Sequence, residues 1–284
     1  MKVLVFGASG MIGSAMFRVL SEKKEWQVWG TLRADSAKRF FSEALIGKLL
    51  ANVNVDSHDA LVRVFAQVQP DVVINCIGLT KHHREADDPL LAIPLNTLLP
   101  HRMADLCAVA GARLVHVSTD CVFAGTKGGY VEGDAPDAGD VYGKSKHLGE
   151  VDYPHAITLR TSTIGHELQN AYGLLEWFLS QQGSCRGFNR AIFSGLPNTV
   201  FAQLVRDVVI PMPELHGLYH VGGQPIGKYE LLSCIANVYG KRIDIIREDD
   251  FVIDRSLNSA RFCKATGYVS ASWPELIQAM YTNP

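Results

Sequence analysis

A tyrosine and a lysine four residues apart stand near the middle of the chain, in Val141-Tyr142-Gly143-Lys144-Ser145-Lys146. On a helix, residues at this spacing lie on one face, one turn apart. A free phenol has a pKa near ~10, and a neighbouring ammonium favours the phenolate. The pair therefore suits proton transfer to or from an oxygen during hydride transfer. Because the same spacing also occurs on ordinary solvated helices, the rest of the chain must support this interpretation.

A hydroxyl that could assist the tyrosine lies 23 residues earlier, at Thr119. It follows the apolar run Arg113-Leu114-Val115-His116-Val117-Ser118, which predicts a buried strand. Ligands of doubly wound sheets bind at the carboxyl ends of the strands, where Thr119 and Asp120 are expected. A threonine at a strand end is usually a cap, so its catalytic role depends on the combination with Tyr142.

A glycine-rich loop, Gly7-Ala8-Ser9-Gly10-Met11-Ile12-Gly13, joins the first predicted strand to the first predicted helix. Its spacing is Gly-x-x-Gly-x-x-Gly, in place of the common Gly-x-Gly-x-x-Gly. Between a strand and a helix, such a loop brings the backbone close to a pyrophosphate at the helix N-terminus. We therefore expect a dinucleotide site here.

The residue after the second strand, Trp26 to Leu32, is Arg33, and no carboxylate occurs before Asp35. NAD sites usually carry an acidic residue at this strand end, whereas an arginine suits the 2′-phosphate of NADP. The sequence therefore favours NADP(H) over NAD(H). A surface arginine in a loop is the alternative.

Strands alternate with helical segments along the first half of the chain. A third strand is expected to end near Asn52–Val55, and another strand is expected at Asp71–Cys76. Helices are expected at Ala60–Val68 and at Pro89–Ala110, the latter kinked near Pro94 and Pro100. This alternation predicts an α/β fold with a doubly wound parallel sheet. In the second half, helices are expected at 171–181, 200–209, after Lys228 and from Ser272, with strands at 218–221 and 243–246.

Composition limits the function classes. The 284 residues are 47% hydrophobic with a formal net charge of −2 and no basic run, which disfavours nucleic acid as a partner. No apolar run reaches membrane-spanning length, and the six scattered cysteines fit reduced thiols, so a cytoplasmic protein is expected. The ten histidines form no metal signature, and no metal is expected.

These motifs together resemble the extended short-chain dehydrogenase/reductase superfamily, and within it the dTDP-4-dehydrorhamnose reductases. The resemblance is carried by 7–13, by Val117-Ser118-Thr119-Asp120-Cys121-Val122-Phe123-Ala124-Gly125 and by Tyr142-Gly143-Lys144-Ser145-Lys146. Weaker similarity continues at 159–162, 227–232 and 255–259. It implies a Rossmann-like sheet with a smaller C-terminal α/β substrate lobe. The expected division is a cofactor domain at 1–161 and a mainly substrate-binding lobe at 162–284, with some segments returning to the core.

The resemblance also implies roles for individual residues. Tyr142 would be the general acid, Lys146 its pKa partner and a ribose ligand, and Thr119 the hydroxyl that orients the carbonyl. Asn96 falls where the family often has an asparagine behind the site. The expected cofactor-binding residues are Gly7, Ser9, Gly10, Met11, Ile12, Arg33, Asn54, Val55, Cys76, Ile77, Gly78, Tyr142, Lys146 and Thr161.

The chain departs from the family pattern mainly on the substrate side. Cys121 stands where the family commonly has tyrosine, and the Ile77–His83 segment lacks the usual continuation. Related epimerase-reductases use a cysteine in this loop, but Cys121 falls one residue later, so we expect it to line the pocket. Expected substrate-binding residues are Thr80, Asp120, Cys121, Arg186, Asn189 and Arg190. The last three suit a diphosphate, although a solvated loop explains them equally well.

The expected function is reduction, with NADPH, of the 4-keto group of a nucleotide-activated 6-deoxy sugar for surface polysaccharides. Two alternatives stay open: a non-catalytic nucleotide-binding regulatory subunit, and an epimerase or dehydratase of the same superfamily. A homodimer through the helices at 88–110 and 140–152 is also expected.

Overall fold

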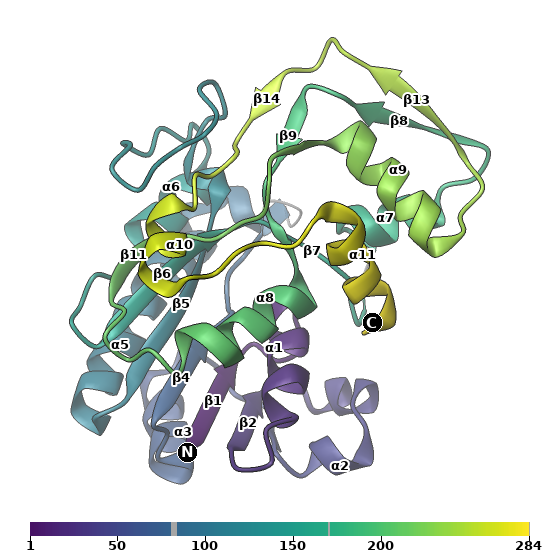
Figure 1. Ribbon diagram of the computed structural model, residues 1–284. Helices are drawn as coiled ribbons and strands as arrows, with labels where there is room; N and C mark the ends of the chain where they lie inside the picture. Colours follow the sequence, from purple (N-terminus) through teal and green to yellow (C-terminus); the bar gives the residue numbers. More distant parts are fainter. Residues whose placement is uncertain (81–83, 170, 284) are drawn as a thin grey trace.

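The computed structural model describes residues 1–80, 84–169 and 171–283. Its centre is a seven-stranded sheet in the order β11-β6-β5-β4-β1-β2-β3, and every neighbouring pair is parallel (Figure 1). This doubly wound Rossmann-like arrangement confirms the predicted fold class. The strands are β1 Lys2–Phe6, β2 Gln27–Thr31, β3 Leu49–Leu50, β4 Val72–Asn75, β5 Arg113–Thr119, β6 Ala156–Thr161 and β11 Gly217–His220.

Helices cover both faces of this sheet because the central strands are apolar on both sides. In β1, Val3 and Val5 join one core cluster while Leu4 and Phe6 join the other. The first cluster includes side chains of α1 (Met11–Ser21), α8 (Asn198–Leu204) and α11 (Trp273–Thr282), and the second those of α3 (His58–Val68) and α5 (Leu99–Ala110). The strand sequence thus places α1 and α3 on opposite faces.

The C-terminal half contributes to both parts of the molecule. Strand β11 pairs with β6 at the sheet edge, and α8 packs on α1. The other segments form a smaller lobe above the sheet, in which β13 pairs with β8, β9 lies between β12 and β14, and β10 pairs with β7 (Figure 1). The lobe elements are β7 Thr163–Ile164, α7 Leu174–Ser180, β8 Ser184–Phe188, β9 Ala191–Phe193, β10 Leu196–Pro197, β12 Ile226–Gly227, α9 Lys228–Tyr239, β13 Asp244–Glu248 and β14 Ile253–Asp254. Two further segments belong with the core: η5 (Val205–Val209) continues α8, and α10 (Ala260–Thr266) packs against β11.

The third strand ends earlier than predicted. We expected it to end near Asn52–Val55, but β3 is Leu49–Leu50, which pairs with Gly30 and Thr31. Asn52 has a φ of 58°, a left-handed conformation that ends an extended segment. The prediction was therefore wrong by a few residues, since Val53 is buried after the turn without joining the ladder.

The predicted kinks in the long helical region correspond to a change of helix type. Helix α4 (Pro89–Ala92) continues into a π-helical segment, η3 (Ile93–Leu98), before α5 begins. Several apolar side chains around this region are exposed: Leu90, Leu91, Ile93, Leu98 and, on α6 (Val141–Leu148), Leu148. They lie where the homodimer was expected, and the dimer stays a prediction.

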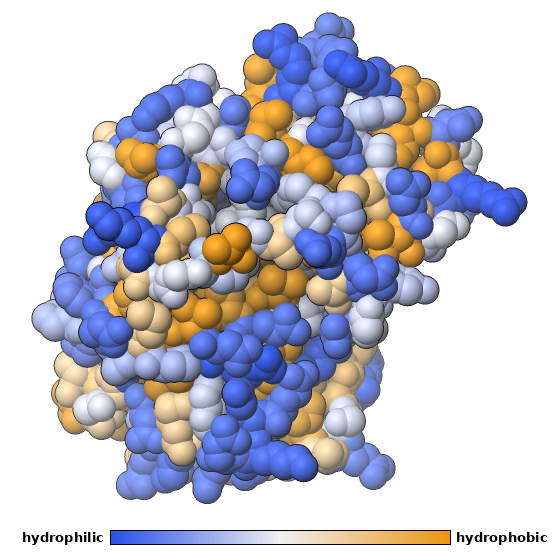
Figure 2. Space-filling model, in the orientation of Figure 1, coloured by the Kyte–Doolittle hydropathy of each residue, from blue (hydrophilic) through white to orange (hydrophobic). Residues whose placement is uncertain are grey.

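The remaining helical turns are η1 Asp35–Phe40, α2 Glu43–Ile46, η2 Arg84–Asp87 and η4 Asp120–Val122. Within the described ranges, no helix is both long and apolar enough to span a bilayer. On the face drawn in Figure 2, hydrophobic residues gather in the middle and hydrophilic residues border them.

Two histidines are buried in the sheet, and their partners fix both as neutral rings. Ile77 N donates to Asn75 Oδ1, so Asn75 Nδ2 donates to His116 Nδ1 at 3.1 Å. His220 Nδ1 donates to the Tyr130 carbonyl at 2.9 Å, and its Nε2 accepts from Arg160 at 3.2 Å. Burial lowers the pKa of both rings, for His220 against an opposing effect of Glu132. Protonation of either ring at low pH would therefore destabilise the folded state.

This arrangement predicts the pH dependence of stability. Because the folded pKa values lie below the unfolded value of ~6.5, the unfolded chain binds protons that the folded chain does not as the pH falls through 6.5. We expect the free energy of unfolding to fall between pH 6.5 and 5 by up to about 1.4 kcal/mol per pH unit for each ring. His220→Gln keeps one donor and one acceptor but cannot titrate, so urea unfolding should show a shallower pH dependence.

The control is His58→Gln, on the exposed first turn of α3, which should leave that dependence unchanged. A wild-type unfolding energy that is flat over this pH range would contradict the assignment of two neutral buried rings.

Candidate active site

A cavity of about 630 Å³ opens at the carboxyl ends of β4, β5 and β6, between the sheet and the C-terminal lobe. Its walls bring together most of the predicted site residues: Ser9, Gly10, Met11, Ile12, Arg33, Cys76, Ile77, Gly78, Thr80, Thr119, Asp120, Cys121, Tyr142, Lys146 and Thr161. Motifs separated by more than 150 residues thus meet at one edge of the sheet, as a parallel α/β sheet requires.

The glycine loop forms a tight cradle beside this cavity. Gly7 has a φ of +83°, and Gly10 N donates to the Gly7 carbonyl at 3.0 Å. A Cβ on Gly13 would collide with that same carbonyl, so only glycine lets α1 begin so close to β1. Helix α1 begins after Gly10 without a side-chain cap. Its first amide groups are therefore left for an anionic ligand, which fits the pyrophosphate of a dinucleotide.

Helix α6 carries Tyr142 and Lys146 to the end of β5. Asp140 caps the helix by accepting from Gly143 N at 2.6 Å, and a Cβ on Gly143 would collide with the Cys121 carbonyl. The absence of a side chain at Gly143 therefore lets α6 pack directly against the loop after β5. Tyr142 is consequently buried against Cys121 and close to Thr119.

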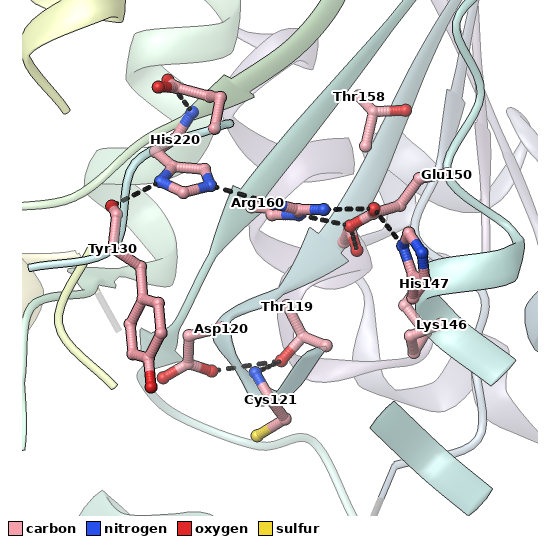
Figure 3. Close-up of polar contacts among 12 residues, drawn as sticks. Thr119, Asp120, Cys121, Tyr130, Lys146, His147, Glu150, Thr158, Arg160 and His220 are labelled. Carbon is pink, nitrogen blue, oxygen red and sulfur yellow. Dashed lines mark hydrogen bonds and ion pairs between the residues drawn. The ribbon is translucent and has the colours of Figure 1, made fainter. Parts of the chain in front are cut away.

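Thr119 is oriented by its own loop. Its hydroxyl donates to Asp120 Oδ1 at 3.1 Å and accepts from Cys121 N at 3.1 Å (Figure 3). The threonine is thus the cap of the short η4 turn, as such residues often are, and it also lines the cavity. The structural and the catalytic interpretations of Thr119 are compatible.

The electrostatics of the tyrosine differ from the expectation that Lys146 lowers its pKa. Burial raises the pKa of Tyr142, the proximity of Cys121 adds to this, and a hydrogen bond with Thr119 acts in the opposite direction. Lys146 is not among the groups that shift the pKa of Tyr142, so it does not offset the effect of burial. Tyr142 is therefore a protonated phenol at neutral pH, the form that a general acid needs.

Lys146 is 5% exposed, and its Nζ donates to the Val117 carbonyl at 2.8 Å. Burial lowers the pKa of Lys146 to about 8, while Glu150 and Cys76 act to raise it. The lysine is thus poised between its charged and neutral forms near physiological pH.

Asn96 lies behind this group, as expected from the resemblance. It is fully buried in η3, where its Oδ1 accepts from Leu79 N at 2.9 Å and its Nδ2 donates to Ser145 Oγ at 3.1 Å. Asn96 therefore ties the wall after β4 to helix α6.

Cys121 lines the cavity but is only 7% exposed. It packs with Tyr142 and Leu79, and the Arg255 guanidinium lies 4.0 Å from its sulfur. The surroundings agree with the expectation of a pocket-lining residue.

Six predicted site residues do not line this cavity. One of them, Gly7, lies in the glycine cradle beside it. Asn54 and Val55 lie beyond the actual end of β3 and do not contribute to the walls of the cavity. For Arg186, Asn189 and Arg190 the sequence left a diphosphate site and a solvated loop equally open, but Ser184–Phe188 is strand β8, paired in parallel with β13. Arg186 there is exposed and pairs with Glu248 at 3.4 Å, while Asn189 donates to Asp249 at 2.9 Å. Arg190, also exposed, lies just beyond this pairing, so the three residues form no phosphate site in the cavity.

The lobe contributes cavity residues that the sequence did not single out. They include Glu167, Gln169, Tyr172, Trp177, Phe193 and Lys228. Their position in the sequence was the one feature that could have indicated them, because most follow β6, whose carboxyl end faces the site. Two of them are also partly exposed aromatic residues. Without the path of the chain through the lobe, nothing distinguished them from ordinary helix and loop residues.

Comparisons with known proteins agree with this geometry. The family model described as the RmlD substrate binding domain matches residues 1–254. Methionine adenosyltransferase 2 subunit beta of Xenopus tropicalis is 27% identical over 259 residues, which cover 84% of this chain and 72% of that protein. A dTDP-4-dehydrorhamnose reductase of Aggregatibacter actinomycetemcomitans is 26% identical over 234 residues, covering 79% and 74%.

Solved structures share the fold over the whole chain. A dTDP-4-dehydrorhamnose reductase of Bacillus anthracis, solved in complex with NADP, superimposes with a TM-score of 0.80 at 19% identity and covers 100% of this chain and 98% of that one. Because the family model extends through the glycine loop, the Thr119 and Tyr142 motifs and most of the C-terminal lobe, the chain belongs to the family of the RmlD substrate binding domain.

Proposed function

We propose that this protein is an NADPH-dependent 4-ketoreductase of a nucleotide-activated 6-deoxy sugar, acting in the cytoplasm in the synthesis of surface polysaccharide sugars. The observation that carries the proposal is the meeting of Thr119, Tyr142 and Lys146 in the same cavity as the glycine cradle. The similarity to a dTDP-4-dehydrorhamnose reductase supports the substrate class.

The cofactor fits the cradle for a steric reason. Side chains at Gly7 and Gly13 would fill the space in which the backbone approaches a pyrophosphate, and the uncapped start of α1 offers amide donors there. Lys146 and Thr161 would hold the ribose end, and Arg33, exposed at the cavity mouth, the 2′-phosphate. When bound, NADPH supplies the hydride that is transferred to the carbonyl carbon.

The protein's own contribution is to orient the ketone and protonate its oxygen. The Thr119 hydroxyl, fixed by the η4 turn, would hydrogen-bond the carbonyl oxygen. Tyr142 would give its phenolic proton to that oxygen as negative charge develops, so that hydride and proton together yield the alcohol. Lys146, which does not lower the pKa of Tyr142 here, would contribute through the ribose of the cofactor.

We infer that residues beyond 162 supply most of the substrate contacts. Trp177, Tyr172 and Phe193 offer aromatic faces in the cavity, and Lys228 offers a positive charge. Together they suit a ligand that has both a ring system and a phosphate group.

A second candidate function is a nucleotide-binding subunit of another enzyme. It is favoured by the similarity to methionine adenosyltransferase 2 subunit beta, which extends over 84% of this chain. Such a subunit has no need of a hydroxyl, a phenol and a buried lysine around one point, and this chain has all three.

The first test removes the proposed acid. Tyr142→Phe keeps the ring in its packed position but removes the proton, so kcat for NADPH oxidation with an accepted 4-keto sugar nucleotide should fall by roughly 10²–10⁴-fold. Binding of NADPH, followed by its fluorescence, should be nearly unchanged. Wild-type turnover in this variant would exclude Tyr142 as the acid.

The second test concerns cofactor choice. In Arg33→Ala a charge-assisted contact with the 2′-phosphate is lost, so the affinity for NADPH should fall on the order of ten-fold while that for NADH hardly changes. The matched control is Lys38→Ala, which removes a half-buried cation that is paired with Asp35 outside the cavity walls. Equal losses for the two cofactors in Arg33→Ala would show that Arg33 does not bind the phosphate.

The third test separates a ketoreductase from an epimerase-reductase. If Cys121 only lines the pocket, Cys121→Ser should still reduce a keto sugar whose stereochemistry is already set. Wild-type protein in deuterated water without NADPH should place no deuterium at C3 or C5, because no thiol acid or base acts there. Exchange that disappears in the serine variant would instead assign an epimerase role to Cys121.

Wild-type protein that neither exchanges deuterium nor oxidises NADPH with any keto sugar in a panel would favour the non-catalytic subunit.

A further inference from the structure

A buried carboxylate, Glu150, lies behind the catalytic lysine and accepts four hydrogen bonds (Figure 3). Oε1 accepts from Ser118 Oγ at 2.8 Å and from Arg160 Nε at 2.6 Å. Oε2 accepts from Arg160 Nη2 at 2.6 Å and from His147 Nδ1 at 3.0 Å. The side chains of Glu150 and Arg160 are only 8% and 2% exposed, so this is a desolvated, bidentate ion pair.

Each partner of Glu150 is next in sequence to a residue of the proposed site. Ser118 precedes Thr119, His147 follows Lys146, and Arg160 precedes Thr161, which lines the cavity. A single carboxylate therefore links the ends of β5 and β6 to helix α6. A shift of any of these elements would break at least one of its four hydrogen bonds.

The ion pair also supports the loop after β5. The Arg160 guanidinium lies 5.1 Å from the centre of the Phe123 ring, and Phe123 stacks on Tyr130 with ring centres 4.0 Å apart. Phe123 directly follows the η4 turn that orients Thr119. Arg160 also donates to His220, whose other nitrogen donates to the Tyr130 carbonyl. The Glu150–Arg160 pair therefore contacts the chain on both sides of Thr119: Glu150 binds Ser118 before it, and Arg160 packs on Phe123 after the η4 turn.

The charges in this region also connect Glu150 to Lys146. Burial alone would raise the pKa of the Glu150 carboxyl, but Arg160, His147 and Ser118 together hold it below its ordinary value, so Glu150 is ionised. Burial lowers the pKa of Lys146 to about 8, and Glu150 is the first of the groups that oppose this effect.

The other titratable groups near Lys146 carry no negative charge at neutral pH. Burial raises the pKa of the Cys76 thiol to about 12 and also raises the pKa of Tyr142, so both are protonated. His116 on β5 is neutral because burial lowers its pKa. His147 and Arg160 are bound to Glu150 itself. Of these groups, Glu150 is the negatively charged one, and it acts on Lys146 through space while Lys146 Nζ donates to the Val117 carbonyl.

We propose that Glu150 is a positioning residue of the catalytic centre, whose buried carboxylate fixes Thr119 and Lys146 relative to each other and favours the ammonium form of the lysine. The kinetic part of this inference depends on the proposed reductase function. The part that concerns the charge of Lys146 does not. A pair that only stabilised the fold would affect unfolding but would leave the titration of Lys146 unchanged.

The decisive experiment measures the titration of Lys146 directly. Protein with lysines labelled with ¹³C at the ε carbon is titrated by NMR, and the Lys146 resonance is assigned by its absence in Lys146→Met. In Glu150→Gln, which keeps the shape and most hydrogen-bonding capacity, the midpoint should fall by roughly one pH unit or more. Glu150→Asp should restore most of the shift. An unchanged midpoint in folded Glu150→Gln overturns the proposal.

Matched variants separate charge from hydrogen bonding. Ser118→Ala and His147→Gln each remove one partner of Glu150 but keep its carboxylate, so Lys146 should titrate near the wild-type pH in both. If Glu150→Gln does not fold because Arg160 is left unpaired, Glu150→Gln combined with Arg160→Gln removes both charges. The double variant is compared with Arg160→Gln, which lacks the same cation but keeps the carboxylate. The Lys146 midpoint should be lower in the double variant than in Arg160→Gln, and equal midpoints would also overturn the proposal.

The pH dependence of kcat should change in the same direction as the NMR titration of Lys146. With an accepted keto sugar, the alkaline limit of the kcat profile should move to lower pH in Glu150→Gln by about the shift seen by NMR, while KM changes little. If no keto sugar is reduced by the wild type, the proposed function fails, but the NMR titration still decides the role of Glu150. A shifted NMR midpoint with an unshifted kinetic limit would overturn the catalytic part.

Discussion

The site depends on keeping an ammonium group inside an α/β core, where it has lost most of its hydration. Lys146 is 5% exposed and has one carbonyl partner, Val117 O, at 2.8 Å. A buried charge is stable only when it is paired or hydrogen-bonded. The Val117 carbonyl near the end of β5 serves this requirement directly, and the Glu150 carboxylate, which is bound to Ser118 and Arg160, favours the charged form of the lysine. The end of β5 and helix α6 also carry Thr119 and Tyr142, so the arrangement of the proposed catalytic groups is tied to the surroundings of this lysine.

Close backbone approach is the second constraint, and glycine satisfies it at two separate points. Gly13 lets α1 begin against β1, which forms the cofactor cradle, and Gly143 lets α6 pack against the loop after β5. Both glycines lie within motifs that the sequence analysis recognised, but for different reasons. The first loop was recognised by its glycine spacing, whereas Gly143 appeared only as the spacer between Tyr142 and Lys146.

Features that depend on neighbouring residues in the sequence could be predicted, whereas features that depend on contacts between distant residues could not. Apolar runs and strand–helix alternation identify the parallel sheet, because strands buried on both faces need them. The end of β3 was missed because Leu49-Leu50 makes only two pairs, and the turn at Asn52 depends on tertiary context. Strand β8 was missed because Arg186 suggested a ligand, while its real partner, Glu248, lies 62 residues further along the chain. The raised pKa of Tyr142 likewise depends on burial by Cys121 and its neighbours, which helical spacing does not reveal.

The distribution of polar groups favours catalysis over a purely scaffolding role. A protein that only presents a nucleotide to a partner needs the glycine cradle and a stable sheet. Replacing a buried ion pair by apolar residues of similar volume is often neutral or stabilising, so buried ionic groups are weak evidence for stability alone. This chain nevertheless buries Lys146, Glu150 and Arg160 beside the same cavity and places Tyr142 and Thr119 on its wall. Groups that contribute little net stability are best explained by the chemistry that they position, and proton transfer to a ketone requires a phenol, a hydroxyl and a cation in this arrangement.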